Sequence, residues 1–283
     1  MVRQFMKNCR LEVRTRKQVE SSSDPGANGL GDGYCTDREL QEKLTDKLLW
    51  SGDPDDVFLR FAFLLSHFAF LRSDELLSIR LSDALTFPLF EVDPAIEGNL
   101  CTLFGIRCSK TNKDGDIEYA SVARNANLNV CPVSAFAISL FLRFQIAGEP
   151  FPDLLQTDWF DTVLFTELHR DPMECVPYHR YYSVCKKILG PPPQEQVEDP
   201  NDVHTKKVVS TSVTHMFRKG GTRHGNLLGF SKDDLENHGR WTKRVIAKHY
   251  LTPIETPVVK SFAGYGKGEK YTLPRRFPAL LTL

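Results

Sequence analysis

The sequence lacks the features that mark secreted, membrane-spanning and zinc-binding proteins. No apolar stretch follows the amino-terminal charges as in a signal peptide, and no run of about 18 apolar residues is long enough to cross a bilayer. The seven cysteines are scattered, odd in number and never spaced as Cys-x-x-Cys. The eight histidines show no zinc-ligand spacing. These absences predict an intracellular chain with reduced thiols, no membrane partner and no bound metal.

A net charge is also absent, because 36 Lys and Arg balance 36 Asp and Glu. This balance does not by itself indicate a nucleic-acid-binding protein. The charge is segregated, however: Lys206–Lys248 holds ten basic and three acidic residues, whereas Phe151–Val203 holds four basic and ten acidic ones. Binding depends on local patches more than on total charge. The basic stretch is therefore a candidate for an anionic partner, and the acidic stretch is expected to face away from it.

The periodicity of the apolar residues predicts a mainly α fold with a small β-hairpin or sheet, an α+β class. The hydrophobic fraction of 41% is ample for a core. Helices are expected at 56–71, 132–146 and 178–189. Strands are expected at 100–108 and 116–123, joined by a turn at 112–115, and a further short strand at 162–167.

Composition divides the chain into three parts: an arm and linker at 1–45, one domain at 46–256, and a tail at 257–283. Residues 1–20 carry six basic and two acidic side chains, and Ser21–Gly33 has the composition of a linker. The arm is interpreted as a DNA contact or a nuclear-import patch, with a solvated terminus as the alternative.

The basic stretch predicts three short helices separated by glycine turns. Thr211 or Ser212 would cap a helix over 211–228, and Gly229 would end it. Ser231-Lys-Asp-Asp has the pattern of a capping box that opens a short helix ending at Gly239. Thr242 would begin a third helix, which carries Tyr250. His215 and Arg218, three residues apart, would share one helix face.

The side chains on these helices suit phosphodiester chemistry. A guanidinium group binds two phosphate oxygens as a planar fork and stays charged at any working pH. A phenol is a poor nucleophile until cations or a base stabilise its anion and align it with phosphorus. Attack by Tyr would conserve the bond for resealing, and it would need no metal or nucleotide cofactor.

The order and spacing of His215, Arg218, Trp241 and Tyr250 resemble the carboxy-terminal signature of tyrosine recombinases. Gly239-Arg-Trp stands where Leu-Gly-His is usual, and Trp is known there in the yeast branch of that family. Upstream, Leu71–Arg80 resembles the motif of the first arginine, and Ser109–Gly115 resembles the lysine hairpin. Further segments, among them Cys131-Pro-Val-Ser-Ala-Phe-Ala, resemble fungal Crypton elements and the recombinase-like domain of a budding-yeast centromere-binding protein. The resemblance covers roughly 49–276.

The resemblance implies a tyrosine recombinase catalytic-domain fold and a role for each motif residue. Two arginines would clamp the scissile phosphate, His215 would act as base or donor, Tyr250 would attack, and Trp241 would pack and donate a hydrogen bond. The arginines are Arg72, oriented by Glu75, and Arg218. Lys110 would be the general acid, with Lys113 as its competitor. Further contacts with double-stranded DNA are expected from Lys113, Lys219, Arg223, Arg240, Lys243 and Arg244. Copies of the chain are expected to associate on DNA in the nucleus.

Three interpretations of function follow from the sequence. The first is a Crypton-type recombinase that cleaves and rejoins DNA through a 3′-phosphotyrosine. The second is a DNA-binding module without chemistry, either centromere-binding or a decayed mobile-element remnant. Only about 45 residues precede the catalytic part, too few for the separate DNA-clamping domain of most recombinases, which favours the second. The third is a basic face for an acidic protein partner. By itself, Arg72 also fits a plain surface salt bridge with Glu75 or Asp74.

Overall fold

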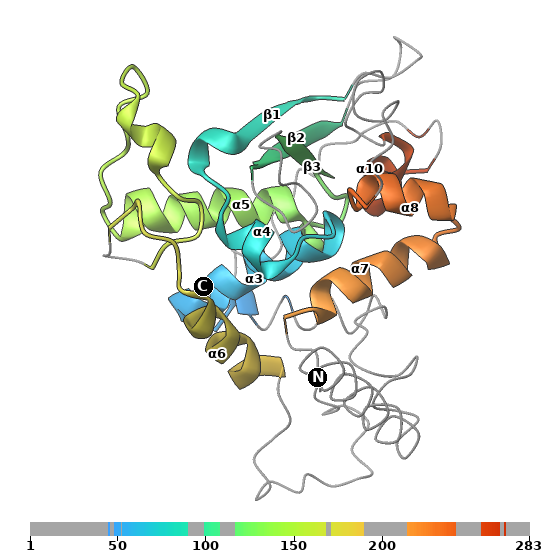
Figure 1. The fold of residues 1–283 in the computed structure, drawn as a ribbon, viewed down its shortest axis with the longest axis horizontal. Helices are drawn as coiled ribbons and strands as arrows, with labels where there is room; N and C mark the ends of the chain where they lie inside the picture. The colour runs from blue at the N-terminus through green and yellow to red at the C-terminus, as the bar shows by residue number, and fades with distance from the viewer. Residues whose placement is uncertain are drawn as a thin grey trace, which may run out of the picture.

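A helix with apolar residues on all its sides forms the centre of the molecule. The computed structural model describes residues 45, 48–51, 53–89, 99–107, 117–167, 171–189, 214–241, 256–266 and 269. Helix α3 (Pro54–Phe68) is buried at every residue from Leu59 onward. Such a helix must be covered all round, and it packs against α5 (Pro132–Phe141), α6 (Tyr178–Leu189) and α7 (Met216–Leu227) (Figure 1). The helix predicted at 56–71 is confirmed, although it ends at Phe68.

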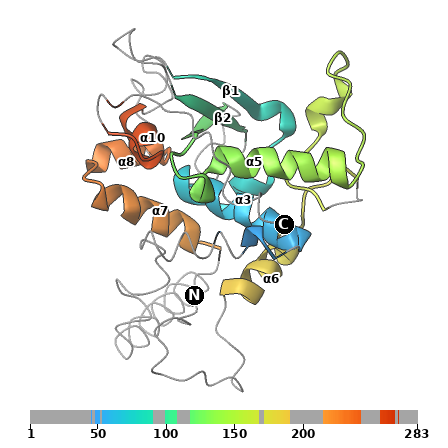
Figure 2. The ribbon, with the colours of Figure 1, turned by 180° about the vertical axis from the view of Figure 1, so that it is seen from behind.

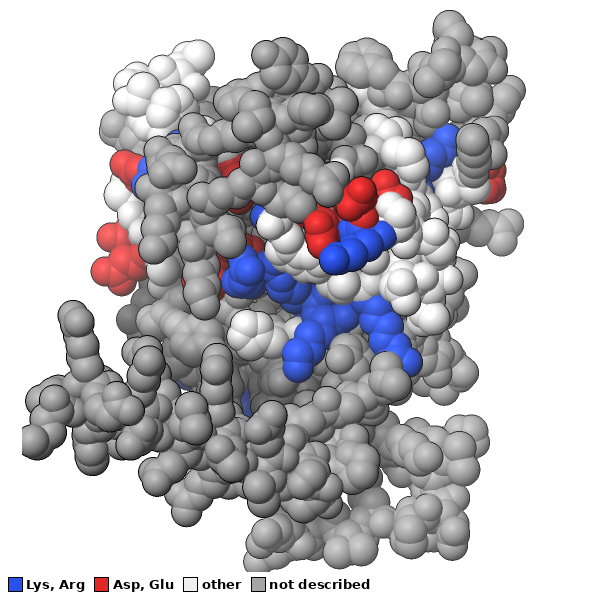
Figure 3. Space-filling view, turned by 45° about the vertical axis from the view of Figure 1, so that its right-hand side comes forward, with Lys and Arg blue, Asp and Glu red and all other residues white. Residues whose placement is uncertain are grey.

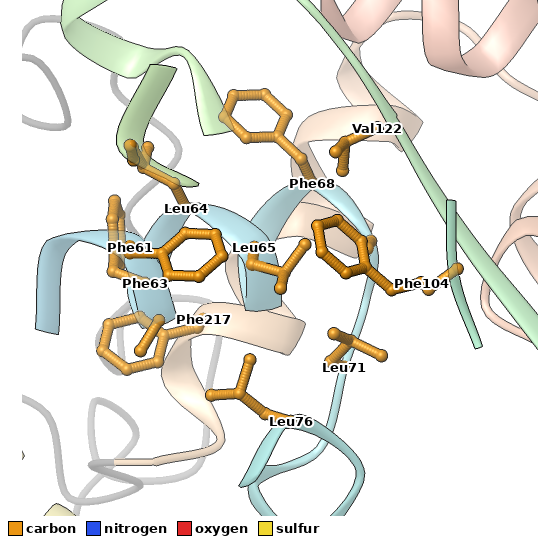
Figure 4. Packing of buried hydrophobic residues seen from close by; sticks show 14 of the residues in the cluster. Phe61, Phe63, Leu64, Leu65, Phe68, Leu71, Leu76, Phe104, Val122 and Phe217 are labelled. Carbon is orange, nitrogen blue, oxygen red and sulfur yellow. The ribbon is translucent and has the colours of Figure 1, made fainter. Parts of the chain in front are cut away.

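Aromatic side chains of α3 make the core contacts between these helices. The Phe61 ring stacks on Phe165 with centroids 4.9 Å apart, and Phe63 meets Phe217 of α7 edge-on at 4.8 Å. Phe104 and Val122 close the core from the sheet side (Figure 4). Aromatic pairs of this geometry stabilise the fold by more than the burial of their apolar surface alone accounts for. The core therefore fixes α7 firmly against the centre of the molecule.

A three-stranded antiparallel sheet covers one side of this core. Its order is β1 (Ala84–Pro88), β2 (Leu100–Ile106) and β3 (Glu118–Ala123). One face contributes to the main core, and the other packs with residues of α10 (Thr256–Phe262) in a second, smaller cluster. The fold is thus mainly helical with a small sheet, as the sequence predicts, and the strands expected at 100–108 and 116–123 are confirmed. The turn expected at 112–115 lies outside the described residues.

The strands differ from the prediction in two places. Strand β1 was not predicted, because Ala84–Pro88 is a short edge strand whose Leu85 is 60% exposed and which ends in a proline. The strand predicted at 162–167 is absent, and Val163 forms only an isolated bridge with Arg80. The helix predicted at 132–146 continues beyond α5 as a π-helical turn, η3 (Leu142–Ile146).

The carboxy-terminal helices differ from the prediction mainly at one end of α7. The helix begins at Met216 with His215 at its N-cap, so the capping role predicted for Thr211 or Ser212 was wrong. Gly229 follows its end with φ of 85°, as expected for a glycine stop. Ser231 caps α8 (Lys232–His238) in a capping box with Asp234, which confirms that prediction. The helix predicted after Thr242 lies outside the described residues.

Helices α8 and α10 lie together beside the sheet (Figures 1 and 2). The Phe262 ring of α10 contacts His238 of α8 with centroids 5.8 Å apart. Three further one-turn helices lie between the larger elements: η1 (Leu81–Asp83), η2 (Leu128–Val130) and η4 (Asp158–Asp161). Among the described helices, none combines the length and apolarity needed to cross a membrane.

Candidate nucleic-acid interface

The candidate site begins where a buried carboxylate opens a short helix. Arg72 precedes α4 (Ser73–Leu77), and its backbone N–H donates to Oε2 of Glu75 at 2.9 Å. The Arg72 guanidinium donates from Nη1 to the other carboxylate oxygen at 2.5 Å. The Glu75 side chain is only 3% exposed, whereas that of Arg72 is 24% exposed. The alternative of a plain surface salt bridge therefore does not describe this pair, because its acid is buried.

A second arginine reaches the same carboxylate from α7. Nη1 of Arg218 donates to Oε2 of Glu75 at 3.1 Å, and Nη2 donates to the carbonyl of Gly239 at 3.4 Å. The guanidinium lies over the indole ring of Trp241, 5.1 Å from its centroid. Arg218 comes close to Glu75 because α7 packs on α3, and α4 follows α3 after one turn. Burial lowers the pKa of Arg218 to about 10, although Glu75 opposes this shift.

A third arginine approaches Glu75 from the turn after α8. Nη2 of Arg240 lies 4.0 Å from Oε2 of Glu75, and the Arg240 side chain is only 9% exposed. Its guanidinium also donates to the carbonyls of His238 and Ala69, at 3.1 and 3.0 Å. We call Glu75 with its three guanidinium groups the arginine cluster. Within it, burial alone would raise the pKa of Glu75, but the Arg72 N–H and the arginines lower it below its ordinary value.

A hollow of about 570 Å³ opens beside the arginine cluster, between α7 and α8. Its lining combines cations, two polar side chains and an apolar floor, namely Arg218, Lys219, Thr222, Arg223, Asn226, Lys232, Leu235 and Trp241. Figure 3 shows Lys and Arg side chains gathered on this side of the molecule. We call the surface formed by Lys219, Arg223 and Lys232 around this hollow the basic face. It presents positive charge next to two buried guanidinium groups.

The structure brings part of the predicted site together. Arg72, Glu75, Arg218 and Trp241 meet in the arginine cluster or stack on it. His215 is exposed at the N-cap of α7, one helical turn before Arg218. Lys219 and Arg223 lie on the basic face, and Arg240 is buried beside Glu75. The other predicted residues lie outside the described part of the chain, namely Lys110, Lys113, Lys243, Arg244 and Tyr250.

Sequence reasoning missed several residues of this region. Thr222 and Asn226 line the hollow and follow Arg218 at intervals of four, so helical spacing would have found them. Lys232 stands inside the capping box of Ser231 and Asp234, so its place in the sequence indicates a helix start and not a ligand contact. The burial of Arg240 has no signal in the sequence, where it is one more basic residue in a basic stretch. Its guanidinium is directed into the protein, toward Ala69 and Glu75.

Comparison with known proteins gives one family and a set of solved structures. The family model described as "Centromere DNA-binding protein complex CBF3 subunit, domain 2" matches residues 16–276. No curated protein matches this chain.

Two solved structures of recombinases, one bound to its substrate and one to a Holliday junction, are similar to the chain at low identity. The XerH recombinase bound to its difH substrate, in a pre-cleavage complex, is 14% identical, with 75% of this chain and 49% of that chain covered and a TM-score of 0.44. The FLP recombinase–Holliday junction complex is 12% identical, with 89% and 55% covered and a TM-score of 0.46. The chain thus spans about half the length of these two structures.

Proposed function

We propose that this chain, which belongs to the family of the centromere DNA-binding protein complex CBF3 subunit, domain 2, binds double-stranded DNA through its arginine cluster and basic face. The family takes its name from a protein complex that binds centromere DNA. A chromosomal target of that kind would require the chain to work in the nucleus. In this proposal the chain is a binding module.

The observation that carries this proposal is the surplus of positive charge around Glu75. Three guanidinium groups lie within 4.0 Å of one carboxylate, and two of them are almost fully buried. Charge that is removed from water without a counter-charge is unfavourable, so the cluster favours a further anion. A phosphodiester group offers two non-bridging oxygens, which match the fork of a guanidinium.

The basic face favours a polymeric anion over a small one. Lys219, Arg223 and Lys232 surround the hollow next to Arg218, more cations than a single small anion can contact. A duplex carries phosphates at regular intervals along each strand, so one phosphate can bind the arginine cluster while its neighbours bind the basic face. Double-stranded DNA therefore accounts for both sets of cations.

A binding measurement tests this proposal. Fluorescence anisotropy with a labelled 30-base-pair duplex should detect binding that weakens steeply as the salt concentration rises. Replacing Arg218 with Gln should lower the affinity about tenfold or more, because a charge-assisted hydrogen bond to phosphate is lost. Arg72→Gln is a companion variant, since Arg72 is partly exposed and its loss disturbs the core less.

Circular dichroism of each variant controls for folding. The proposal fails if the folded Arg72 and Arg218 variants bind the duplex as tightly as the unchanged protein. It also fails if binding of the unchanged protein does not depend on salt, because phosphate contacts always release counterions.

Cleavage and rejoining of DNA is a second candidate function, favoured by the meeting of Arg72 and Arg218 on one carboxylate. Two guanidinium groups from distant parts of the chain can bind two oxygens of one phosphate and stabilise the charge of a pentavalent state. In this proposal Lys110, or its competitor Lys113, protonates the leaving oxygen, His215 acts as base or donor, and Tyr250 attacks phosphorus.

Incubation with nicked suicide duplexes, followed by denaturing gels, separates the two candidates. Cleavage predicts a covalent protein–DNA band, and Tyr250→Phe should abolish that band while binding persists. A band that survives in Tyr250→Phe excludes this nucleophile. Binding with no band at any duplex design leaves the chain as a module without chemistry.

A further inference from the structure

Two turns that meet beside Glu75 each contain a strained residue. Phe70, between α3 and α4, has φ of 52°, and Arg240, after α8, has φ of 57°. Within the described ranges these are the only residues other than glycine with positive φ. The left-handed region is unfavourable for a residue with a Cβ atom, so it persists only where the surroundings impose it. The contacts around both residues must therefore hold them in this conformation.

The contacts between the two turns show what these side chains do. We call residues 68–72 and 238–241 the turn pair. Nε2 of His238 donates to the carbonyl of Phe68 at 2.7 Å, which binds a carbonyl that the end of α3 leaves without a helical partner. The Phe70 ring lies nearly parallel to the indole of Trp241, with centroids 5.9 Å apart. The two turns are thus joined by a hydrogen bond to a backbone carbonyl and by a stacking contact between aromatic rings.

Arg240 bridges the turn pair with the two arms of its guanidinium. Nη1 donates to the carbonyl of His238 in its own turn, and Nη2 donates to the carbonyl of Ala69 in the other turn. The same Nη2 lies 4.0 Å from Glu75. A planar fork with fixed spacing can make these contacts together, whereas a lysine ammonium is a single point on a flexible stem.

We propose that Arg240 is a positioning residue that holds the turn of Arg72 against the turn of Trp241. It makes no contact with DNA itself. By fixing the turn pair it keeps the guanidinium groups of Arg72 and Arg218 on opposite oxygens of Glu75, ready for one phosphate. The proposal rests on the proposed DNA binding, and it replaces the expectation that Arg240 is a direct DNA contact.

The substitution Arg240→Lys tests this role, because it keeps the charge and removes the fork. If Arg240 positions Arg72, affinity for the 30-base-pair duplex should fall about tenfold, since small displacements of a preorganised group are costly. A residue that served only as a cation near phosphate would be replaced by lysine with little loss. Arg180→Lys on α6, outside the basic face, is the matched control and should bind within about twofold of the unchanged protein.

Arg240→Gly provides a second variant in case lysine disturbs folding. Glycine relieves the unfavourable φ but removes the hydrogen bonds to His238 and Ala69, so the thermal midpoint should fall while the folded protein also binds DNA more weakly. Binding is measured well below the midpoint of each variant, which separates positioning from a loss of folded protein. If Arg240→Lys binds like the unchanged protein, the positioning role is overturned. If the unchanged protein binds no duplex, the proposed function itself fails.

Discussion

At the scale of the residue, one buried carboxylate organises the candidate site. Glu75 accepts hydrogen bonds from Arg72 and Arg218 and lies 4.0 Å from the guanidinium of Arg240. It lowers the repulsion between groups that carry the same charge, yet it cannot neutralise all three. The site is therefore held together while it retains an attraction for a further anion.

Replacing Glu75 with Gln should destabilise the protein by about 3 kcal/mol, because the buried arginines lose their counter-charge. The amide oxygen can still accept from the Arg72 N–H, so the loss reports mainly on charge. Urea unfolding followed by circular dichroism measures this change. The matched control is Glu236→Gln on α8, whose partner Lys232 is 87% exposed; its cost should stay below about 1 kcal/mol. Equal losses in the two variants would contradict the role of Glu75.

His238 should make the stability of the protein depend on pH. Burial and the nearby Arg240 together lower its pKa to about 4, against the hydrogen bond to Phe68. The unfolded chain therefore takes up a proton at a higher pH than the folded chain. Stability is complete above about pH 6.5 and is lost as the pH falls toward 4, by about 2 kcal/mol between pH 7 and pH 5. His238→Gln should remove this part of the loss in urea unfolding, and an unchanged pH dependence would refute the assignment.

At the scale of the element, the close approach of α7 to α3 decides where Arg218 lies. A Cβ atom at Gly221 would stand 1.9 Å from the carbonyl oxygen of His67 in α3. Only glycine permits this contact between two helix backbones. The helix α7 contains Gly220 and Gly221 in succession, which lowers its helix propensity, so packing must compensate.

Gly221→Ala should therefore lower the free energy of unfolding by about 3 kcal/mol, because helix backbone must move. Gly225→Ala is the matched comparison on the same helix. There the new Cβ would meet the ends of the Leu235 and Phe262 side chains, which can shift. Its cost should be no more than about 1 kcal/mol, since alanine also favours the helix. Chemical denaturation measures both, and a Gly225 variant as unstable as the Gly221 variant would contradict this packing.

At the scale of the whole molecule, charge is separated although the total is zero. The basic face lies on α7 and α8, whereas the acidic segment 151–167 lies between η3 and α6, on the opposite side of the molecule (Figure 1). This separation orients the molecule in the field of a polyanion. Association of several copies on DNA, and the division of the chain at residues 45 and 256, stay predictions.

The double substitution Lys219→Gln and Arg223→Gln should reduce the slope of log affinity against log salt by about 2, one for each lost phosphate contact. Thermal unfolding should change little, because neither side chain belongs to the core. Lys186→Gln on α6 is the control and should leave the slope unchanged. A double variant with the slope of the unchanged protein would show that the basic face does not contact DNA.

Much of the fold follows from local sequence patterns. The apolar residues around α3, the box of Ser231 and Asp234, and the stop at Gly229 are signals within a few residues of one another. The family resemblance inferred from the ordered motifs is confirmed by the family match. The edge strand β1 escaped prediction because its residues are partly exposed and end in proline, so no alternation distinguishes them.

The sequence by itself determined the helical class, the segregation of charge and the order of the motif residues, because each depends on composition and short-range spacing. Only the tertiary structure decided that Arg240 is buried and that it binds Ala69, a residue 171 positions away. That contact depends on how α3, α7 and α8 pack. The periodicity of a sequence indicates which face of a helix is buried, but it does not indicate which turn packs against that face. The arginine cluster therefore forms only through the packing of the helices, although the sequence analysis names each of its residues.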